Sequence, residues 1–234
     1  MKKTFLILIF TLTTFVCFGQ IEHLEPARDF KNYEGESKVY YDNLFSKLYK
    51  EFSQTPYARY TSMPSFTSQY AFSVEATDGK YYIISNCLSE NFWYARERNK
   101  VKVITNKTEI DHTLYSKIGE LFQIFVEQTK KIETDGVSCS FVTADNDTIE
   151  GVKRVIKLDG EVYYFTITDT NGEIKTGQTW SPNKDSMLYR LVNVCDKLFS
   201  LDSKSNSTMT DILNEIDTLI EDYRYLIDHV KDDR

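Results

Sequence analysis

Short segments of alternating apolar and polar residues, joined by Asx-Gly pairs, are the feature of this sequence that most constrains its fold. The segments SQYAFSVEA and KYYIISNCL lie on either side of Asp78-Gly79. Asp-Gly tolerates the positive φ that a tight hairpin turn requires, so this pair predicts a β-hairpin. Two further Asx-Gly pairs, at 159–160 and 171–172, predict a hairpin between GVKRVIKL and EVYYFTIT and a turn into EIKTGQTW. The sequence therefore predicts an antiparallel sheet built from hairpins.

Other segments are assigned from composition and position. FWYARE and KVKVI, on either side of Asn99, predict another hairpin, and GVSCSFVTA predicts a strand. Residues 55–68 contain two prolines and many hydroxyl groups, which is typical of a loop.

Apolar residues recur at helical spacing in four regions. They predict helices from Val39 to a stop before Pro56, from Leu114 to about Lys131, from Leu188 to Phe199, and over residues 209–231. Thr108 and Asp111 have the spacing of a capping box before the second helix. Asp185 is placed to cap the third helix, and Thr208 and Asp211 to start the fourth.

We therefore predict an α+β protein with about four amphipathic helices packed on an antiparallel sheet. Residues 38–234 are predicted to form a single α+β domain, preceded by an irregular segment at 20–37. The similar stretches DHTLY and DSMLY suggest a degenerate duplication of a strands-then-helix unit, with halves at 68–132 and 135–201.

The C-terminal helix, at 209–231, has an apolar face of nine residues. Such a face is broader than a coiled-coil seam and is typical of a helix that packs on a globular core. We expect this helix to dock on its own domain, with dimerisation as the alternative.

The first 19 residues have the layout of a secretory signal peptide. Lys2 and Lys3 precede a run of apolar residues and threonines that is short for a membrane span, and Gly19 supplies a small residue at the cleavage site. Lipid anchoring at Cys17 is disfavoured, because Val16 stands where a bacterial lipobox has a small residue. The FGQ ending and the general pattern resemble those of secreted proteins from the Bacteroidetes. The resemblance implies export to the periplasm or the extracellular space, and implies no activity.

Charge and composition narrow the classes of partner. The net charge is −7, and two of the basic residues lie in the leader, so the mature chain is more acidic still. An acidic chain without a basic stripe is a poor binder of nucleic acid. No segment after the leader is long and apolar enough for a stable membrane span. The 41% hydrophobic and 14% aromatic content predicts a folded chain.

The mature chain keeps three cysteines, Cys87, Cys139 and Cys195. An odd number leaves at least one thiol free or paired between chains. The spacing lacks CxxC, so neither a zinc site nor a thioredoxin-type motif is predicted. We interpret the three residues as small semi-buried hydrophobes, with an intrachain disulfide as the alternative.

Catalytic motifs are absent from the sequence. A serine or cysteine nucleophile needs a nearby base, but the three histidines, at 23, 112 and 229, are scattered. Ser181 and Asp185 have structural interpretations: Pro182 favours an extended Ser181, and Asp185 caps a helix. The acidic stretch DNDTIEG lacks the pattern of a calcium loop. We predict no cofactor and no metal, whereas a pair of carboxylates would leave no sequence signal.

Two patches are candidates for ligand binding. NFWYARERNK combines Trp93 and Tyr94 with Arg96 and Arg98, residue types that bind sugars or anions by stacking and bidentate hydrogen bonds. The alternative is a strand with a charged outer face. YARYTSMPSF is a second, aromatic and hydroxyl-rich stretch.

These features favour a non-catalytic binding or interaction module of the cell envelope, with a protein, peptide or glycan as its ligand. A hydrolase that uses a carboxylate pair or an unrecognised site is the alternative. A deep pocket lined by converging acids would favour the hydrolase, and a shallow aromatic face would favour the binding module.

Overall fold

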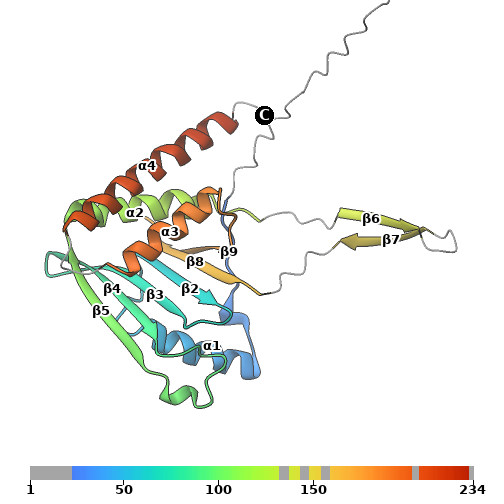
Figure 1. Cartoon of the computed structure of the whole chain (residues 1–234), viewed down its shortest axis with the longest axis horizontal. Coiled ribbons are helices and arrows are strands. Elements are labelled where there is room, and N and C mark those ends of the chain that lie inside the picture. The colour runs from blue at the N-terminus through green and yellow to red at the C-terminus, as the bar shows by residue number, and fades with distance from the viewer. Residues whose placement is uncertain (1–22, 132–136, 143–147, 154–158, 202–205, 232–234) are drawn as a thin grey trace, which may run out of the picture.

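The computed structural model describes residues 23–131, 137–142, 148–153, 159–201 and 206–231. Its centre is a seven-stranded antiparallel sheet with the strand order β1-β9-β8-β2-β3-β4-β5 (Figure 1). The strands of this sheet are β1 (Glu25–Pro26), β2 (Ala58–Pro64), β3 (Tyr70–Thr77), β4 (Lys80–Leu88), β5 (Val103–Ile110), β8 (Glu161–Thr168) and β9 (Ile174–Trp180). Strands β6 (Val137–Val142) and β7 (Thr148–Lys153) pair with each other in a second sheet.

Helices cover both faces of the large sheet (Figure 1). Helices α2 (His112–Glu127), α3 (Met187–Phe199) and α4 (Asn206–Lys231) lie on one face, and α1 (Gly35–Leu48) lies on the other. The predicted α+β class, with four helices and an antiparallel sheet, is confirmed. None of the helices in the described ranges combines the length and apolar character needed to cross a bilayer.

Alternation along the strands divides the core into two clusters. Tyr60, Phe72 and Phe165 point toward α2–α4 and belong to the larger cluster. Ala71, Ile84 and other alternate positions point toward α1 and form the smaller one.

The Asp78-Gly79 prediction is confirmed. Both residues have positive φ, 53° and 74°, and β3 pairs with β4 from Thr77 opposite Lys80 onward. The turn at Gly172, with φ 81°, likewise joins β8 to β9.

The predicted loop at 55–68 is wrong over most of its length, because β2 runs through it between β8 and β3. The first five residues of β2 are all buried, including the hydroxyl-bearing Thr61 and Ser62. A central strand covered on both faces loses the apolar–polar alternation that marks a half-exposed one. Pro64 stands at its last position, where a missing N–H is tolerated.

The predicted hairpin through Asp159-Gly160 is also wrong. Both edges of β8 are occupied, one by β2 and the other by β9, and β7 pairs with β6 instead. The predicted strand FWYARE is a series of turns ending in a short 3₁₀ helix, Arg98–Lys100, and β5 begins only at Val103.

Helix caps agree with the predictions in part. Asp111 caps α2, since its carboxylate accepts a hydrogen bond from Leu114 N at 2.7 Å. Thr108 lies in β5 and donates to the Leu201 carbonyl, so the capping box is not formed. Ser186, and not Asp185, caps α3 by accepting from Tyr189 N.

Ser181 is not extended as predicted, because its φ is +36°. The segment 20–37 is less irregular than predicted: Glu25–Pro26 adds a short strand to β9, and α1 starts at Gly35. The last helix starts at Asn206, before the predicted Thr208.

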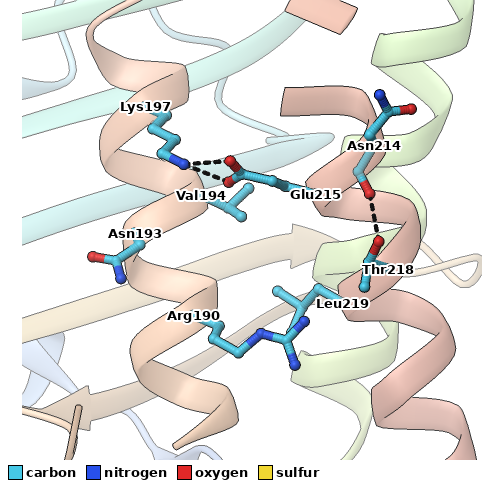
Figure 2. Close-up of a pocket in the computed structure, with 8 residues that line it drawn as sticks. All are labelled: Arg190, Asn193, Val194, Lys197, Asn214, Glu215, Thr218 and Leu219. Carbon is cyan, nitrogen blue, oxygen red and sulfur yellow. Dashed lines mark hydrogen bonds and ion pairs between the residues drawn. The ribbon is translucent and has the colours of Figure 1, made fainter. Parts of the chain in front are cut away.

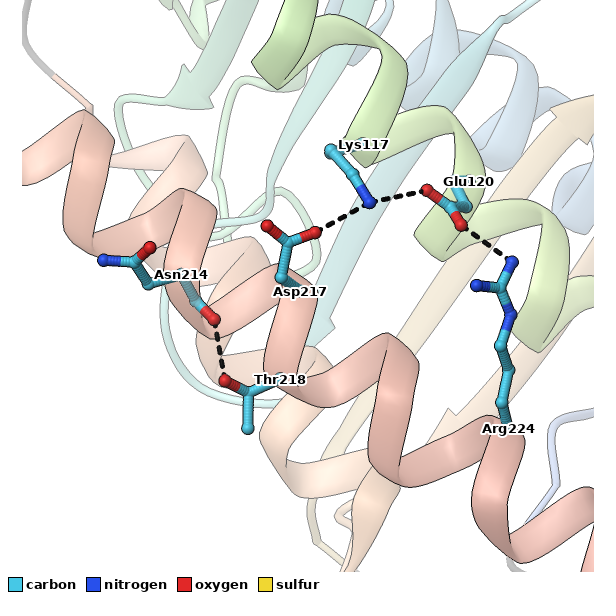
Figure 3. Close-up of polar contacts among 6 residues, drawn as sticks. All are labelled: Lys117, Glu120, Asn214, Asp217, Thr218 and Arg224. Atoms are coloured by element: carbon cyan, nitrogen blue, oxygen red, sulfur yellow. Dashed lines mark hydrogen bonds and ion pairs between the residues drawn. The ribbon is translucent and has the colours of Figure 1, made fainter.

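Helix α4 docks on its own domain, as its broad apolar face predicted. Ile216 is fully buried, and the Tyr223 ring stacks on Phe125 of α2 with centroids 3.9 Å apart. Ion pairs flank this contact: Lys117 lies 2.8 Å from Asp217, and Arg224 lies 2.7 Å from Glu120 (Figure 3). Solvent-exposed pairs contribute little, about 0–1 kcal/mol each, so apolar burial dominates the docking.

The leader lies outside the described residues, as do the segments 132–136, 143–147 and 154–158 next to β6 and β7. The signal peptide, the single domain over 38–234 and the duplication of 68–132 and 135–201 therefore stay predictions.

Candidate functional site

The predicted aromatic patch lies in the loop at 89–102, which joins β4 to β5. Phe92 is fully buried against Tyr40 of α1, with ring centroids 5.5 Å apart, and anchors the loop to the smaller core cluster. The two following side chains point outward: Trp93 is 60% exposed and Tyr94 is 61% exposed. A buried ring thus fixes two exposed rings on a short turn.

Arg98 holds this turn in place. Its Nε donates to the Phe92 carbonyl at 3.1 Å, and its Nη2 donates to the Trp93 carbonyl at 3.2 Å. The guanidinium also lies over the rings of Tyr40 and Trp93, at 5.1 and 5.9 Å from their centroids. Burial raises the pKa of Tyr40 to about 12, although the charge of Arg98 opposes this shift. Arg98 therefore positions Trp93, and two of its three nitrogens are engaged in doing so.

A third exposed ring comes from the turn after β2. Phe66, 64% exposed, lies nearly parallel to Tyr94, with an interplanar angle of 8° and centroids 6.5 Å apart. Asn91 connects the two segments, because its Nδ2 donates to the carbonyls of Ser65 and Thr67, at 3.3 and 2.7 Å. We call Phe66, Trp93 and Tyr94 the aromatic surface.

Of the four residues predicted for this patch, the structure brings Trp93, Tyr94 and Arg98 together. Arg96 is exposed and has no hydrogen-bond or ion-pair partner among the described residues. Phe66 was not among the predicted residues, and its only sequence signal was its place in the second aromatic stretch.

A cavity of about 390 Å³ lies on the α1 face of the sheet, next to the turn that carries Phe66. Its floor is an apolar row across three strands, in which Met63 pairs with Val162 and Val162 pairs with Trp180. Gln178 continues the same face of β9. We call this the Trp180 cavity, and no sequence pattern identified it.

The rim of the Trp180 cavity is polar. Arg28 and Asp159 contribute opposite charges, and neither has an ion-pair partner among the described residues. Ser65 and Gly160 join the two sides: Ser65 N donates to the Gly160 carbonyl at 3.1 Å, and Gly160 N donates to Ser65 Oγ at 3.2 Å. A Cβ at Gly160 would lie 2.7 Å from Trp180 Nε1, so glycine permits the close approach of the indole.

Ser181, next to the cavity, makes two hydrogen bonds with Glu161. Its Oγ accepts from Glu161 N at 3.0 Å, and its own N–H donates to the Glu161 carbonyl at 2.9 Å. These two bonds hold the strained residue at the end of β9 against the start of β8.

Two carboxylates on the opposite face accept hydrogen bonds from a cluster of tyrosines. Asp196 of α3 accepts hydrogen bonds from Tyr60 Oη at 2.9 Å and Tyr70 Oη at 2.8 Å. Glu161 accepts from Tyr163, whose ring stacks on Tyr60. Burial raises the pKa of Asp196, the two tyrosine hydroxyls lower it in part, and the charge of Glu161 adds to the increase.

A second cavity, of about 330 Å³, lies between α3 and α4 (Figure 2). Its two cations are neutralised within the protein: Lys197 Nζ lies 2.6 Å from Glu215 Oε2, and Arg190 Nη1 lies 2.7 Å from Asp222 Oδ2. We interpret this cavity as the polar seam of the helix pair.

Metal ligands do not gather in the part of the chain that the structure describes, where no group of three or more His, Cys, Asp or Glu could hold an ion. Cys87 and Cys195 are free thiols, and the side chain of Cys139 lies outside the described part. His112 contacts the Tyr81 ring, and His229 Nδ1 lies 2.8 Å from the Tyr225 carbonyl. No family model, curated protein or solved structure matches this chain.

Proposed function

We propose that the protein is an exported, non-catalytic module of the cell envelope that binds a glycan on the aromatic surface. The observation that carries this proposal is the fixation of three exposed rings by buried contacts. Phe92 and Arg98 hold Trp93, and Asn91 holds the turn of Phe66 beside Tyr94. Burying such rings on binding is favourable, and fixing them in advance lowers the entropic cost.

A glycan fits this surface better than a nucleic acid or an apolar helix. Sugar rings present a face of C–H bonds that packs on an aromatic ring, while their hydroxyls remain in water. Each of the three rings is more than half exposed, so the surface is a platform rather than a groove for an apolar helix. The acidic chain disfavours nucleic acid.

A glycan array probed with the mature protein tests the proposal. We expect retention on specific glycans, and mass spectrometry should recover the retained glycans unchanged. If no glycan on the array retains the protein, the proposal is contradicted. The export step is tested separately, by the intact mass of protein from the envelope of the native host. A chain that begins at Gln20 is expected, and one that retains residues 1–19 or carries lipid at Cys17 would contradict it.

A hydrolase is the second candidate, and the environment of Asp196 favours it. A partly buried carboxyl with a raised pKa, hydrogen-bonded to two tyrosines, is a feature of catalytic acids. Against this, Asp196 accepts two tyrosine hydrogen bonds that join α3 to the sheet. Turnover of a retained glycan that is lost in Asp196→Asn, with binding kept, would establish the hydrolase and exclude the non-catalytic module.

A further inference from the structure

The Trp180 cavity combines an apolar floor with a polar rim, which are the features that a binding site for one small polar ring needs. Its floor consists of Met63, Val162 and Trp180, which are consecutive partners across β2, β8 and β9. None of the lining residues belongs to α1, so the helix leaves this strip of the sheet face open. A flat apolar strip with an indole at one end is complementary to the C–H face of a sugar ring.

The polar rim is held in position by backbone contacts. Gln178 Oε1 accepts from Arg28 N at 3.2 Å, which places Arg28 on one side of the strip. The Ser65–Gly160 bonds close the other side and place Asp159 next to it. The guanidinium of Arg28 and the carboxylate of Asp159 are planar polar groups that can each bond two neighbouring hydroxyls.

Charge and size select the ligand class. Arg28 and Asp159 give the rim one cation and one anion, so it favours neither a polyanion nor a polycation. The volume of about 390 Å³ lies at the small end of the range of roughly 300–1,000 Å³ for ligand pockets. The cavity therefore fits a single ring better than an extended chain.

We propose that the Trp180 cavity binds one neutral saccharide unit of the glycan. This inference rests on the proposed function for the class of ligand, but it concerns a different set of residues. Ser65 lines the cavity and its neighbour Phe66 belongs to the aromatic surface, so one chain segment serves both.

The two tryptophans make the two sites separately observable. Trp93 and Trp180 are the only tryptophans in the sequence, so Trp93→Phe leaves Trp180 as the sole indole and Trp180→Phe leaves Trp93. Each variant is titrated with cellobiose, maltose and N,N′-diacetylchitobiose while indole emission is recorded. The zwitterion glycylglycine is titrated in parallel.

In the Trp93→Phe protein we expect at least one disaccharide to change Trp180 emission saturably, and glycylglycine to have no effect. Adding Arg28→Ala should weaken this binding by about tenfold, the loss expected for one hydrogen bond to a charged group. Arg224→Ala is the matched control, because it removes an exposed arginine of α4, on the opposite face of the sheet, and should leave the affinity unchanged.

The outcomes distinguish the two proposals. A saturable response in Trp180→Phe but none in Trp93→Phe would overturn this inference and leave the aromatic surface as the binding site. The reverse result would support the cavity and overturn the aromatic surface. A response of Trp180 to glycylglycine alone would replace the saccharide with a peptide-like zwitterion, and no response in either variant would overturn both proposals.

Discussion

Asp196 provides a quantitative test of how α3 is attached to the sheet. Its Oδ1 accepts hydrogen bonds from Tyr60, which is fully buried, and from Tyr70, which is partly exposed. Asp196→Ala removes both bonds. Leaving the buried Tyr60 hydroxyl unsatisfied should cost about 1–3 kcal/mol, and losing the Tyr70 bond, which water can replace, about 0.5–1 kcal/mol. We expect a total loss of about 1.5–4 kcal/mol in the free energy of unfolding.

Asp196→Asn separates the charge from the hydrogen bonds. Its side-chain oxygen can still accept from both tyrosines, whereas the cost of burying a negative charge disappears. At pH 7 we therefore expect Asp196→Asn to be as stable as the wild type or more stable. Tyr70→Phe is the control for the partly exposed bond and should cost less than about 1 kcal/mol.

The pH dependence of this comparison has a defined sign. Burial raises the pKa of Asp196 in the folded state above that of the unfolded chain, about 3.9 for an aspartate. Folding then favours the protonated form, so its contribution to stability is full below the unfolded pKa. The contribution is lost as the pH rises through the folded pKa. Relative to the wild type, Asp196→Asn should gain stability from about pH 4 upward.

Urea unfolding followed by circular dichroism, repeated from pH 4 to pH 7, measures these differences. The reasoning fails if Asp196→Asn loses as much stability as Asp196→Ala at pH 7. It also fails if the advantage of Asp196→Asn decreases as the pH rises, since that would mean the folded protein stabilises the charged carboxylate.

Three further predictions concern packing and thiol chemistry. Ile216→Ala, in the buried face of α4, should cost about 2–5 kcal/mol in urea unfolding, whereas Tyr225→Ala, at a 62% exposed position of the same helix, should change stability by less than about 0.5 kcal/mol; equal effects would refute the docking of α4. Gly119→Ala would place a Cβ 2.1 Å from Tyr57 Oη, so the gain of about 0.5–1 kcal/mol expected for Ala inside a helix should be lost; in the Tyr57→Ala background the same substitution should be stabilising, and strict additivity in the double-mutant cycle would contradict the clash. Burial raises the pKa of both the Cys87 and Cys195 thiols, so iodoacetamide at pH 7 should modify Cys195 only after unfolding and Cys87 slowly; rapid modification of Cys195 in the folded protein, read by peptide mass spectrometry, would disprove its burial.

The parts of the fold that were predicted correctly depend on local signals. The hairpin at Asp78-Gly79 follows from two residues that tolerate positive φ, and both have it. The buried face of α4 follows from the helical spacing of its apolar residues, and Ile212, Ile216 and Leu219 are all buried. Such signals come from residues close together in the sequence, so they can be recognised without knowledge of the tertiary contacts.

The errors concern features that tertiary contacts decide. Strand β2 is paired along both edges and covered by helices on both faces, so its sequence lacks the alternation of a half-exposed strand. One partner of β8 is β2, which is far from it in the sequence, and no turn residue specifies such a pairing. Local propensity is regularly overridden in such positions.

The sequence predicted only the part of the candidate site that lies within one loop. Trp93 and Tyr94 are neighbours in one loop and were identified as a candidate ligand contact. Phe66 comes from another turn, and the Trp180 cavity combines residues from near Arg28, Ser65, Asp159 and Trp180. Sites assembled from distant segments leave no spacing pattern.

The most direct test of the proposed function is the glycan array repeated with three proteins: the wild type, Trp93→Ala and Tyr225→Ala. The two variants each remove a ring that is about 60% exposed, one inside the aromatic surface and one on α4. If the aromatic surface binds the glycan, Trp93→Ala should lose at least about 1.4 kcal/mol, a tenfold weaker affinity, while Tyr225→Ala retains wild-type binding. Equal binding by Trp93→Ala and the wild type, with both folded by circular dichroism, would contradict the account.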